Sequence, residues 1–219
     1  MARVSVHLLP LLLLCAAGPG CLSAASHLGA APTPPGRRSW GVALDGVVFE
    51  RGRELRVLPS VQLMGRRGMG EDWDAGFRAY LLGLEVGTRH RLLSRGRLTL
   101  GAQPSLELAY VPVTNNSVEL LHARVRGALV ADWRLAPDWT LTLGTRLAFG
   151  GAAPPTWLRG YAEGAVLLAQ PEGLASLAVA LDPHLQLRLE AGAGVPLQVG
   201  GSARRPVASG GLSLMWTGD

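Results

Sequence analysis

Two adjacent segments, Val118 to Trp133 and Trp139 to Phe149, alternate between apolar and polar residues along most of their length. In the first, alanine, valine and leucine alternate with His122, Arg124 and Arg126; in the second, leucines alternate with polar residues. Successive side chains of a strand point to opposite faces, so each segment predicts a strand with one apolar and one polar face. The Pro-Asp pair between them favours a turn, so together they predict a β-hairpin.

The same alternation recurs from Trp40 to Trp216 and predicts about ten strands, with a range of 8–12. At Leu81–Gly83 the apolar phase shifts by one residue, which indicates either a β-bulge inside one strand or a tight turn between two; we favour the bulge. The predicted strands cover about 40–49, 55–63, 73–89, 98–110, 118–133, 139–149, 157–169, 177–181 and 185–195, and the last one ends at Trp216.

Composition supports many short elements joined by turns, because the 219 residues include 29 glycines and 15 prolines. Hydrophobic residues make up 48% of the chain, yet no apolar run after the N-terminus approaches the roughly 20 residues of a membrane-spanning helix. Any membrane crossing must therefore use strands. The net charge of +5 would allow nucleic-acid binding, but no basic-aromatic platform supports it, and we predict no such partner.

The first 25 residues predict a secretory signal peptide, with Arg3 before an apolar core and Ser23–Ala25 as a small-residue cleavage site. Residues 26–38 predict a flexible leader, and residues 39–219 the barrel domain. Both cysteines lie in the signal peptide, so the mature chain would hold no disulfide. An alternative is a lipoprotein anchored through Cys21.

Tryptophan positions favour a membrane barrel over a soluble sandwich, which would bury its tryptophans in mid-strand. All six lie at the ends of predicted strands, where an aromatic girdle meets the lipid headgroups. The predicted girdle consists of Trp40, Trp73, Trp133, Trp139, Trp157 and Trp216.

The signal peptide, the alternating strands and the terminal pattern Leu212-x-Leu214-x-Trp216 together resemble small bacterial outer-membrane β-barrel proteins. The resemblance covers Trp40 to Trp216 and is architectural. It implies an all-β, antiparallel, transmembrane-type barrel, monomeric and inserted into the outer membrane by the barrel-assembly machinery.

No catalytic, metal or cofactor site is predicted. His122 is the only histidine on the polar face of a strand, and Ser105 and Glu107 are conceivable partners for it, although nothing in the sequence places them together. We therefore predict a non-enzymatic, structural or surface-interacting role. The alternatives are a secreted or lipid-anchored soluble barrel or sandwich that binds a small ligand in the periplasm or outside the cell, and a barrel-embedded lipid-modifying hydrolase.

With both termini in the periplasm, ten strands would place the first, third and later odd-numbered loops outside the cell. Several arginines would then line the outer rim, and guanidinium groups bind phosphate bidentately. The sequence thus predicts contact with lipopolysaccharide through Arg89, Arg91, Arg95, Arg97, Arg204 and Arg205. It also places Leu141 near the middle of the lipid face and Thr142 in the lumen.

Overall fold

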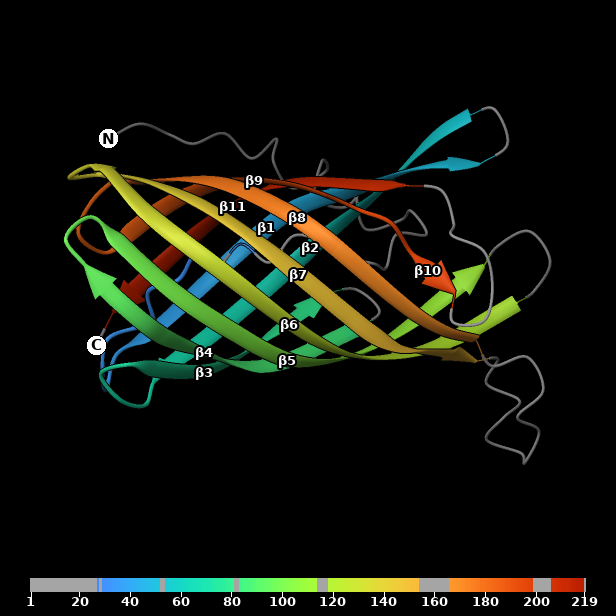
Figure 1. Ribbon diagram of the computed structural model, residues 1–219, viewed down its shortest axis with the longest axis horizontal. Helices are drawn as coiled ribbons and strands as arrows, with labels where there is room; N and C mark the ends of the chain where they lie inside the picture. The colour runs from blue at the N-terminus through green and yellow to red at the C-terminus, as the bar shows by residue number, and fades with distance from the viewer. Residues whose placement is uncertain are drawn as a thin grey trace, which may run out of the picture.

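The chain forms a closed barrel of antiparallel strands (Figure 1). The structure is a computed structural model that describes residues 27, 29–51, 54–80, 83–113, 118–153, 166–198 and 206–218. Its strands are β1 (Arg38–Arg51), β2 (Glu54–Gly68), β3 (Trp73–Tyr80), β4 (Gly83–Arg95), β5 (Leu98–Val113), β6 (Val118–Ala136), β7 (Trp139–Ala153), β8 (Val166–Ala180), β9 (Leu185–Gly194), β10 (Leu197–Gln198) and β11 (Val207–Gly218).

From β1 to β9, strands that are consecutive in the chain pair with each other, and the last strand, β11, pairs with both β9 and β1 to close the ring. The β1–β11 seam runs in continuous register from the pair Arg38↔Gly218 to the pair Phe49↔Val207. The short β10 continues the line of β9 and pairs with β8, so the wall has ten strands. No helix in the described part of the chain is long and apolar enough to span a membrane. The predicted fold class is confirmed.

The two ends of the barrel differ. We call the end that holds Arg38 and Gly218 the terminal end, and the opposite end the loop end. Four short turns lie at the terminal end, at residues 69–72, 96–97, 137–138 and 181–184. The connections at the loop end include the longest one, from Ala153 to Val166, most of which lies outside the described residues.

Two predicted strands have different limits in the structure. The predicted bulge at Leu81–Gly83 is wrong, because Tyr80 pairs with Gly83 and the chain reverses there to form the β3–β4 hairpin. Residues 166–169, the described end of the segment predicted as 157–169, share one strand, β8, with residues 177–180, and Pro171 and Gly173 interrupt the apolar pattern of its outer face. Residues 157–165 of that predicted strand lie outside the described residues. The wall formed by the described residues has the predicted number of about ten strands.

The predicted division of faces is confirmed. On β7, Leu143, Leu147 and Phe149 are exposed on the outside, whereas Thr142 and Arg146 are buried inside. The other strands repeat this arrangement, so the barrel is apolar outside and polar inside.

The five tryptophans within the described residues all lie on the outer face near the terminal end. Trp40 and Trp216 face each other across the closing seam. Trp73 opens β3, and Trp133 and Trp139 flank the β6–β7 turn. All five side chains are between 37% and 55% exposed. Trp157 lies outside the described residues, so the described part of the predicted girdle is a single ring at one end.

Candidate functional site: the barrel lumen

The lumen is lined by charged side chains that balance one another. Among the described residues it holds seven inward-facing arginines and seven acids, six of them buried and the seventh, Glu85, with a side chain 16% exposed. The arginines are Arg66, Arg78, Arg89, Arg124, Arg126, Arg146 and Arg188, and the acids are Asp45, Asp74, Glu85, Glu107, Asp132, Glu172 and Glu190.

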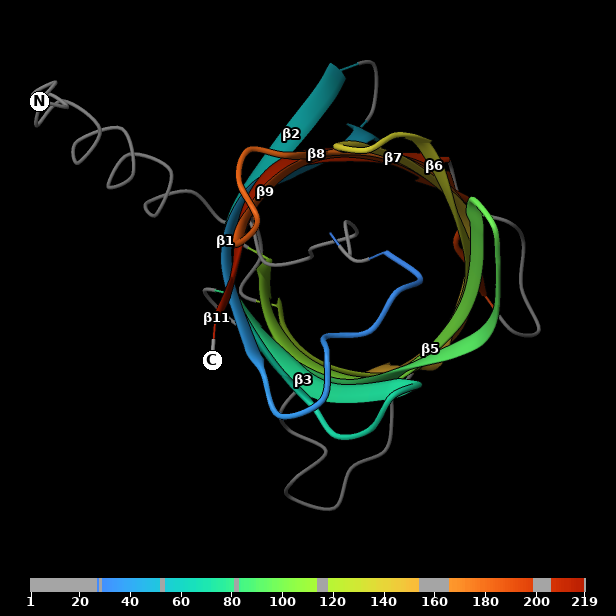
Figure 2. The same cartoon turned by 90° about the vertical axis from the view of Figure 1, so that its left-hand side faces the viewer.

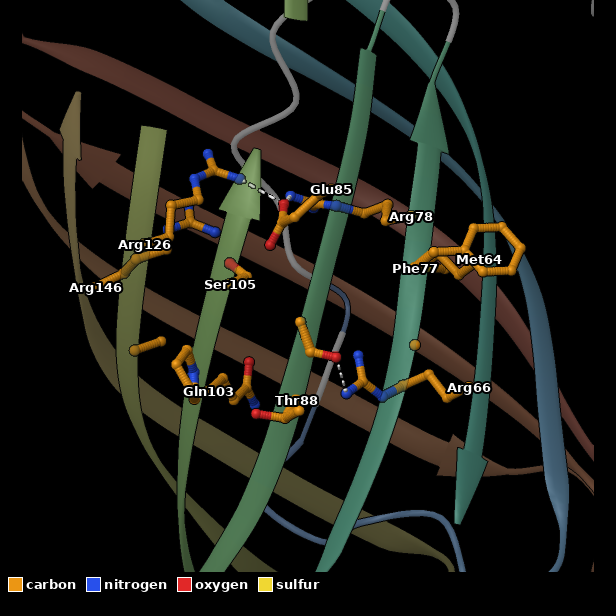
Figure 3. A pocket seen from close by; sticks show the side chains of 14 residues that line it. Met64, Arg66, Phe77, Arg78, Glu85, Thr88, Gln103, Ser105, Arg126 and Arg146 are labelled. Carbon is orange, nitrogen blue, oxygen red and sulfur yellow. Dashed lines mark hydrogen bonds and ion pairs between the residues drawn. The ribbon is translucent and has the colours of Figure 1, made fainter. Parts of the chain in front are cut away.

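In mid-barrel the charges form a connected network across β3 to β6. Arg78 and Arg126 approach Glu85 from opposite sides (Figure 3), and the Nη1 atom of Arg126 lies 2.8 Å from the Oε2 atom of Glu85. Glu107 accepts hydrogen bonds at 2.9 Å from both Nε and Nη2 of Arg124 and also binds the hydroxyl of Tyr80. The Nε atom of Arg126 lies 3.2 Å from Glu107, so this guanidinium joins the two carboxylates.

The space left beside this network is small. The cavity drawn in Figure 3, bordered by Met64, Gln103, Ser105 and the Arg126 network, measures about 30 Å³. That volume accommodates about one or two water molecules. Side chains therefore fill the middle of the lumen. This packing fits a structural barrel, whereas a channel for solutes would need an open lumen.

The leader enters the lumen from the terminal end. Figure 2, a view along the barrel, shows the blue segment that precedes β1 crossing the interior of the ring. His27, Ala30 and Thr33 are each no more than 5% exposed. The part of the leader around these three residues is therefore packed inside the barrel, whereas residues 34–38 are exposed.

Carboxylates from three strands hold the backbone of the leader. Asp74 on β3 accepts a hydrogen bond from the Thr33 amide at 2.6 Å, and Asp132 on β6 accepts one from the Ala30 amide at 2.8 Å. Farther in, Glu190 on β9 accepts the amide of His27 at 2.9 Å. Each acid thus satisfies a backbone donor that would otherwise be buried without a partner.

Donors from β4 and β5 complete this site by binding one carbonyl of the leader. The carbonyl oxygen of Gly29 accepts one hydrogen bond from Nε2 of Gln103, at 2.9 Å, and another from Nη1 of Arg89, at 3.3 Å. Arg89 also pairs with Asp74, whose other oxygen accepts the Nε atom of Arg66 at 2.7 Å. A second cavity of about 270 Å³ lies at the terminal end between the leader and the β8–β9 turn.

Four of the six arginines predicted to contact lipopolysaccharide lie within the described residues. Arg89 is buried in the lumen, and Arg91 binds Asp72 at 2.7 Å beside the β3 start. Arg95 and Arg97 adjoin the β4–β5 turn, also at the terminal end. Arg204 and Arg205 lie outside the described residues, and the described positions on either side, Gln198 and Val207, are at the loop end. Because β4 returns the chain to the terminal end, the described arginines lie there or in the lumen, and contact with lipopolysaccharide stays a prediction.

Among the residues considered for a hydrolase, Ser105 and His122 are separated along the barrel wall. His122 is inward and buried, but it pairs in register with Ala109, whereas Ser105 pairs with Arg126 four residues farther along β6. Glu107 is held by Arg124 and Arg126. Within the described ranges, no group of three or more histidines, cysteines and acids is arranged to hold a metal ion.

Sequence reasoning missed the site that holds the leader. Asp74, Asp132 and Gln103 belong to ordinary alternating strands, and nothing in their spacing indicates a shared ligand. The available signal was in the leader itself, where Gly29-Ala-Ala-Pro32 is narrow enough to pass between the walls of a small barrel.

Neither protein-family models nor curated proteins gave a match to the chain. Solved structures with a similar fold include Neisserial surface protein A, at 11% identity over 83% of this chain and 94% of that chain, with a TM-score of 0.41. The NanC porin matches at 10% identity over 82% and 98%, with a TM-score of 0.45. The outer-membrane protease OmpT from Escherichia coli matches at 7% identity over 88% and 100%, with a TM-score of 0.46. At these values the likeness carries no conclusion about activity.

Proposed function

We propose that the protein is a monomeric outer-membrane β-barrel with a structural or surface-interacting, non-enzymatic role. The observation that carries this proposal is the apolar outer face, on which Val57, Val125 and Leu129 are each at least 60% exposed. In water a surface of this kind would promote aggregation, whereas in a bilayer it meets hydrocarbon.

The length of the strands fits this environment. On β7 the outer face runs from Trp139 to Phe149, which is about the 9–11 residues that a tilted strand needs to cross a bilayer. The exposed Leu212, Leu214 and Trp216 extend the apolar surface to the closing strand, β11. We expect this strand to present the predicted signal to the barrel-assembly machinery.

Orientation follows from the unequal ends. Outer-membrane barrels generally have short periplasmic turns and longer extracellular loops. The terminal end has the four short turns, so we place it, with the tryptophan ring, on the periplasmic side. On this topology any contact with lipopolysaccharide would depend on the loop end, whereas Arg91, Arg95 and Arg97 would face the periplasm.

A soluble ligand-binding barrel fits the described residues less well. Such a barrel keeps its apolar residues inside, but the clusters of buried apolar residues in the described part of this lumen are small, for example the cluster of Ala43, Met64 and Met215. Most of the interior consists of the arginine–carboxylate network. We therefore favour insertion in the outer membrane over the secreted or Cys21-anchored alternatives.

Extraction and conductance together test the proposal. We expect the protein to stay with envelope membranes during carbonate extraction and to leave planar bilayers without steady open channels, because its lumen is packed. Release by carbonate would refute membrane insertion. Stable large conductance would refute the filled lumen and leave the insertion intact.

A further inference from the structure

The barrel wall binds the leader with side chains, as a protein binds a separate peptide ligand, and not by adding it to the sheet as a further strand. The backbone of the leader is bound by side chains from five different strands, β3, β4, β5, β6 and β9. Among the described residues that precede β1, the one sheet-like contact is an isolated bridge between Pro35 and Gly68. The ten strands pair with one another without it, so the wall closes independently of the leader.

The wall is shaped to admit a backbone at close range. A Cβ atom on Gly101 would lie 2.7 Å from the Ala30 carbonyl oxygen, and one on Gly68 would lie 1.9 Å from the oxygen of Pro34. Both distances are far below an ordinary contact. Glycine at these two wall positions therefore opens the track along which the leader runs.

The same geometry restricts the residues of the leader. A Cβ atom on Gly29 would lie 2.6 Å from a carboxylate oxygen of Asp132 and 2.8 Å from the Nη2 atom of Arg188. Both atoms end flexible side chains, so a small shift admits a methyl group, whereas a leucine side chain has to displace the Asp132 carboxylate from the Ala30 amide. Ala30 is fully buried. The prolines that follow, at positions 32, 34 and 35, hold the chain extended and reduce the entropy lost when it binds.

We propose that the terminal half of the lumen is a binding site for an extended peptide, with the leader as its tethered native ligand. The site recognises backbone amides through Asp74, Asp132 and Glu190, and it recognises one carbonyl through Gln103 and Arg89. The site accepts a peptide with two small residues, at the positions of Gly29 and Ala30, that are followed by prolines. It rejects a peptide with a bulky side chain at the position of Gly29. A detached leader peptide occupies the same site and exchanges with free peptide.

The structure supplies a place to cut the tether. Pro34, Pro35, Gly36 and Arg37 are exposed at the mouth, and Gly36 has a φ of 76° in a turn. The cavity of about 270 Å³ beside the leader provides space at the terminal end through which a cut peptide can leave. Cutting after the barrel has folded avoids any requirement for the leader during assembly.

The test inserts a specific protease sequence after Gly36 in the full chain, folds the protein in detergent and cuts it. Gel filtration followed by mass spectrometry then measures how much leader peptide stays with the barrel. We expect retention, and we expect excess synthetic peptide of residues 26–36 to replace the bound one. The same peptide with Gly29→Leu is the matched control and should compete at least about tenfold less well, since it clashes with Asp132 and Arg188.

A second variant tests the wall. Asp132→Asn removes the charge that binds the Ala30 amide and should speed release of the cut leader by about tenfold, while the heat-modified gel mobility of the barrel stays unchanged. Immediate loss of the peptide from the cut parent protein would overturn the proposal. Equal competition by the parent and Gly29→Leu peptides would also overturn it, because the leader would then be held without the recognition described.

Discussion

Replacing Leu143 with arginine places a charge on the outer face of β7 near the centre of the proposed membrane crossing. The side chain is 53% exposed, and its register neighbours are Ala131 and Ala175, which are too small to shield a guanidinium group. A strand tilted by about 45° rises roughly 2.4 Å per residue along the membrane normal. Leu143 is four residues from Trp139, so it lies about 10 Å inside the tryptophan ring.

At that depth the substitution should destabilise the protein by about 2–4 kcal/mol, the range for arginine near the middle of an outer-membrane barrel. Leu135→Arg is the matched control, because Leu135 is 48% exposed but lies beyond Trp133 in the β6–β7 turn region. It should cost about 0–1 kcal/mol. Urea titrations of folding into liposomes, followed by tryptophan fluorescence, measure both values. Equal and small penalties would mean that this face meets water, where exposed substitutions usually change stability by about 0.5 kcal/mol or less.

Three further predictions concern the lumen and the topology. Glu107→Gln removes a charge shared by Arg124 and Arg126 and should destabilise the protein by about 3–5 kcal/mol in the same titration; no change would mean that water screens these groups. A tag inserted at Gly201 should react with antibody on intact cells and a tag at Gly96 should not, and the reverse labelling would invert the barrel. Neutralising Arg91, Arg95 and Arg97 together should shift the melting temperature equally with and without lipopolysaccharide, whereas a shift specific to lipopolysaccharide would place the terminal end outside the cell.

The division into lipid and lumen faces could be predicted because it depends only on the parity of side chains along each strand. Leu106, Glu107 and Leu108 alternate in the sequence as they do in the barrel wall. Depth was harder to predict. Leu141 pairs in register with Trp133, which places it near the membrane interface and away from the middle of the lipid face. The depth of a residue in the membrane depends on the register between neighbouring strands, and the sequence of a single strand does not reveal that register.

The phase of the apolar pattern also could not distinguish a bulge from a turn at Leu81–Gly83. Both shift the apolar pattern by one residue, and the distinction depends on whether Tyr80 meets Gly83 across a hairpin. In β8 the opposite error arose, because Pro171 and Gly173 have the composition of a turn. Their inward neighbours, Glu172 and Leu174, keep the strand parity, and Glu172 binds Arg146 in the lumen.

The lumen partners were only partly predictable. An arginine-rich and acid-rich inner face indicates ion pairs in general, but the pairing of Arg124 with Glu107 depends on the β5–β6 register. The sequence placed Thr142 in the lumen but did not indicate its partners. Thr142 is fully buried, donates to Asp132 at 2.7 Å and accepts from Arg188 at 2.9 Å, so an added arginine there would meet Arg188 and a packed wall.

Tryptophan quenching by brominated lipids tests most directly whether the outer face lies in a bilayer with its tryptophans at one interface. The measurement uses a Trp157→Phe variant, so that the remaining fluorescence comes from the five tryptophans of the ring at the terminal end. We predict strong quenching by lipids brominated close to the headgroup and much weaker quenching by lipids brominated near the ends of the acyl chains, because all five lie near an interface. Fluorescence that no brominated lipid quenches would contradict membrane insertion, and quenching strongest at the chain ends would contradict the placement of the ring.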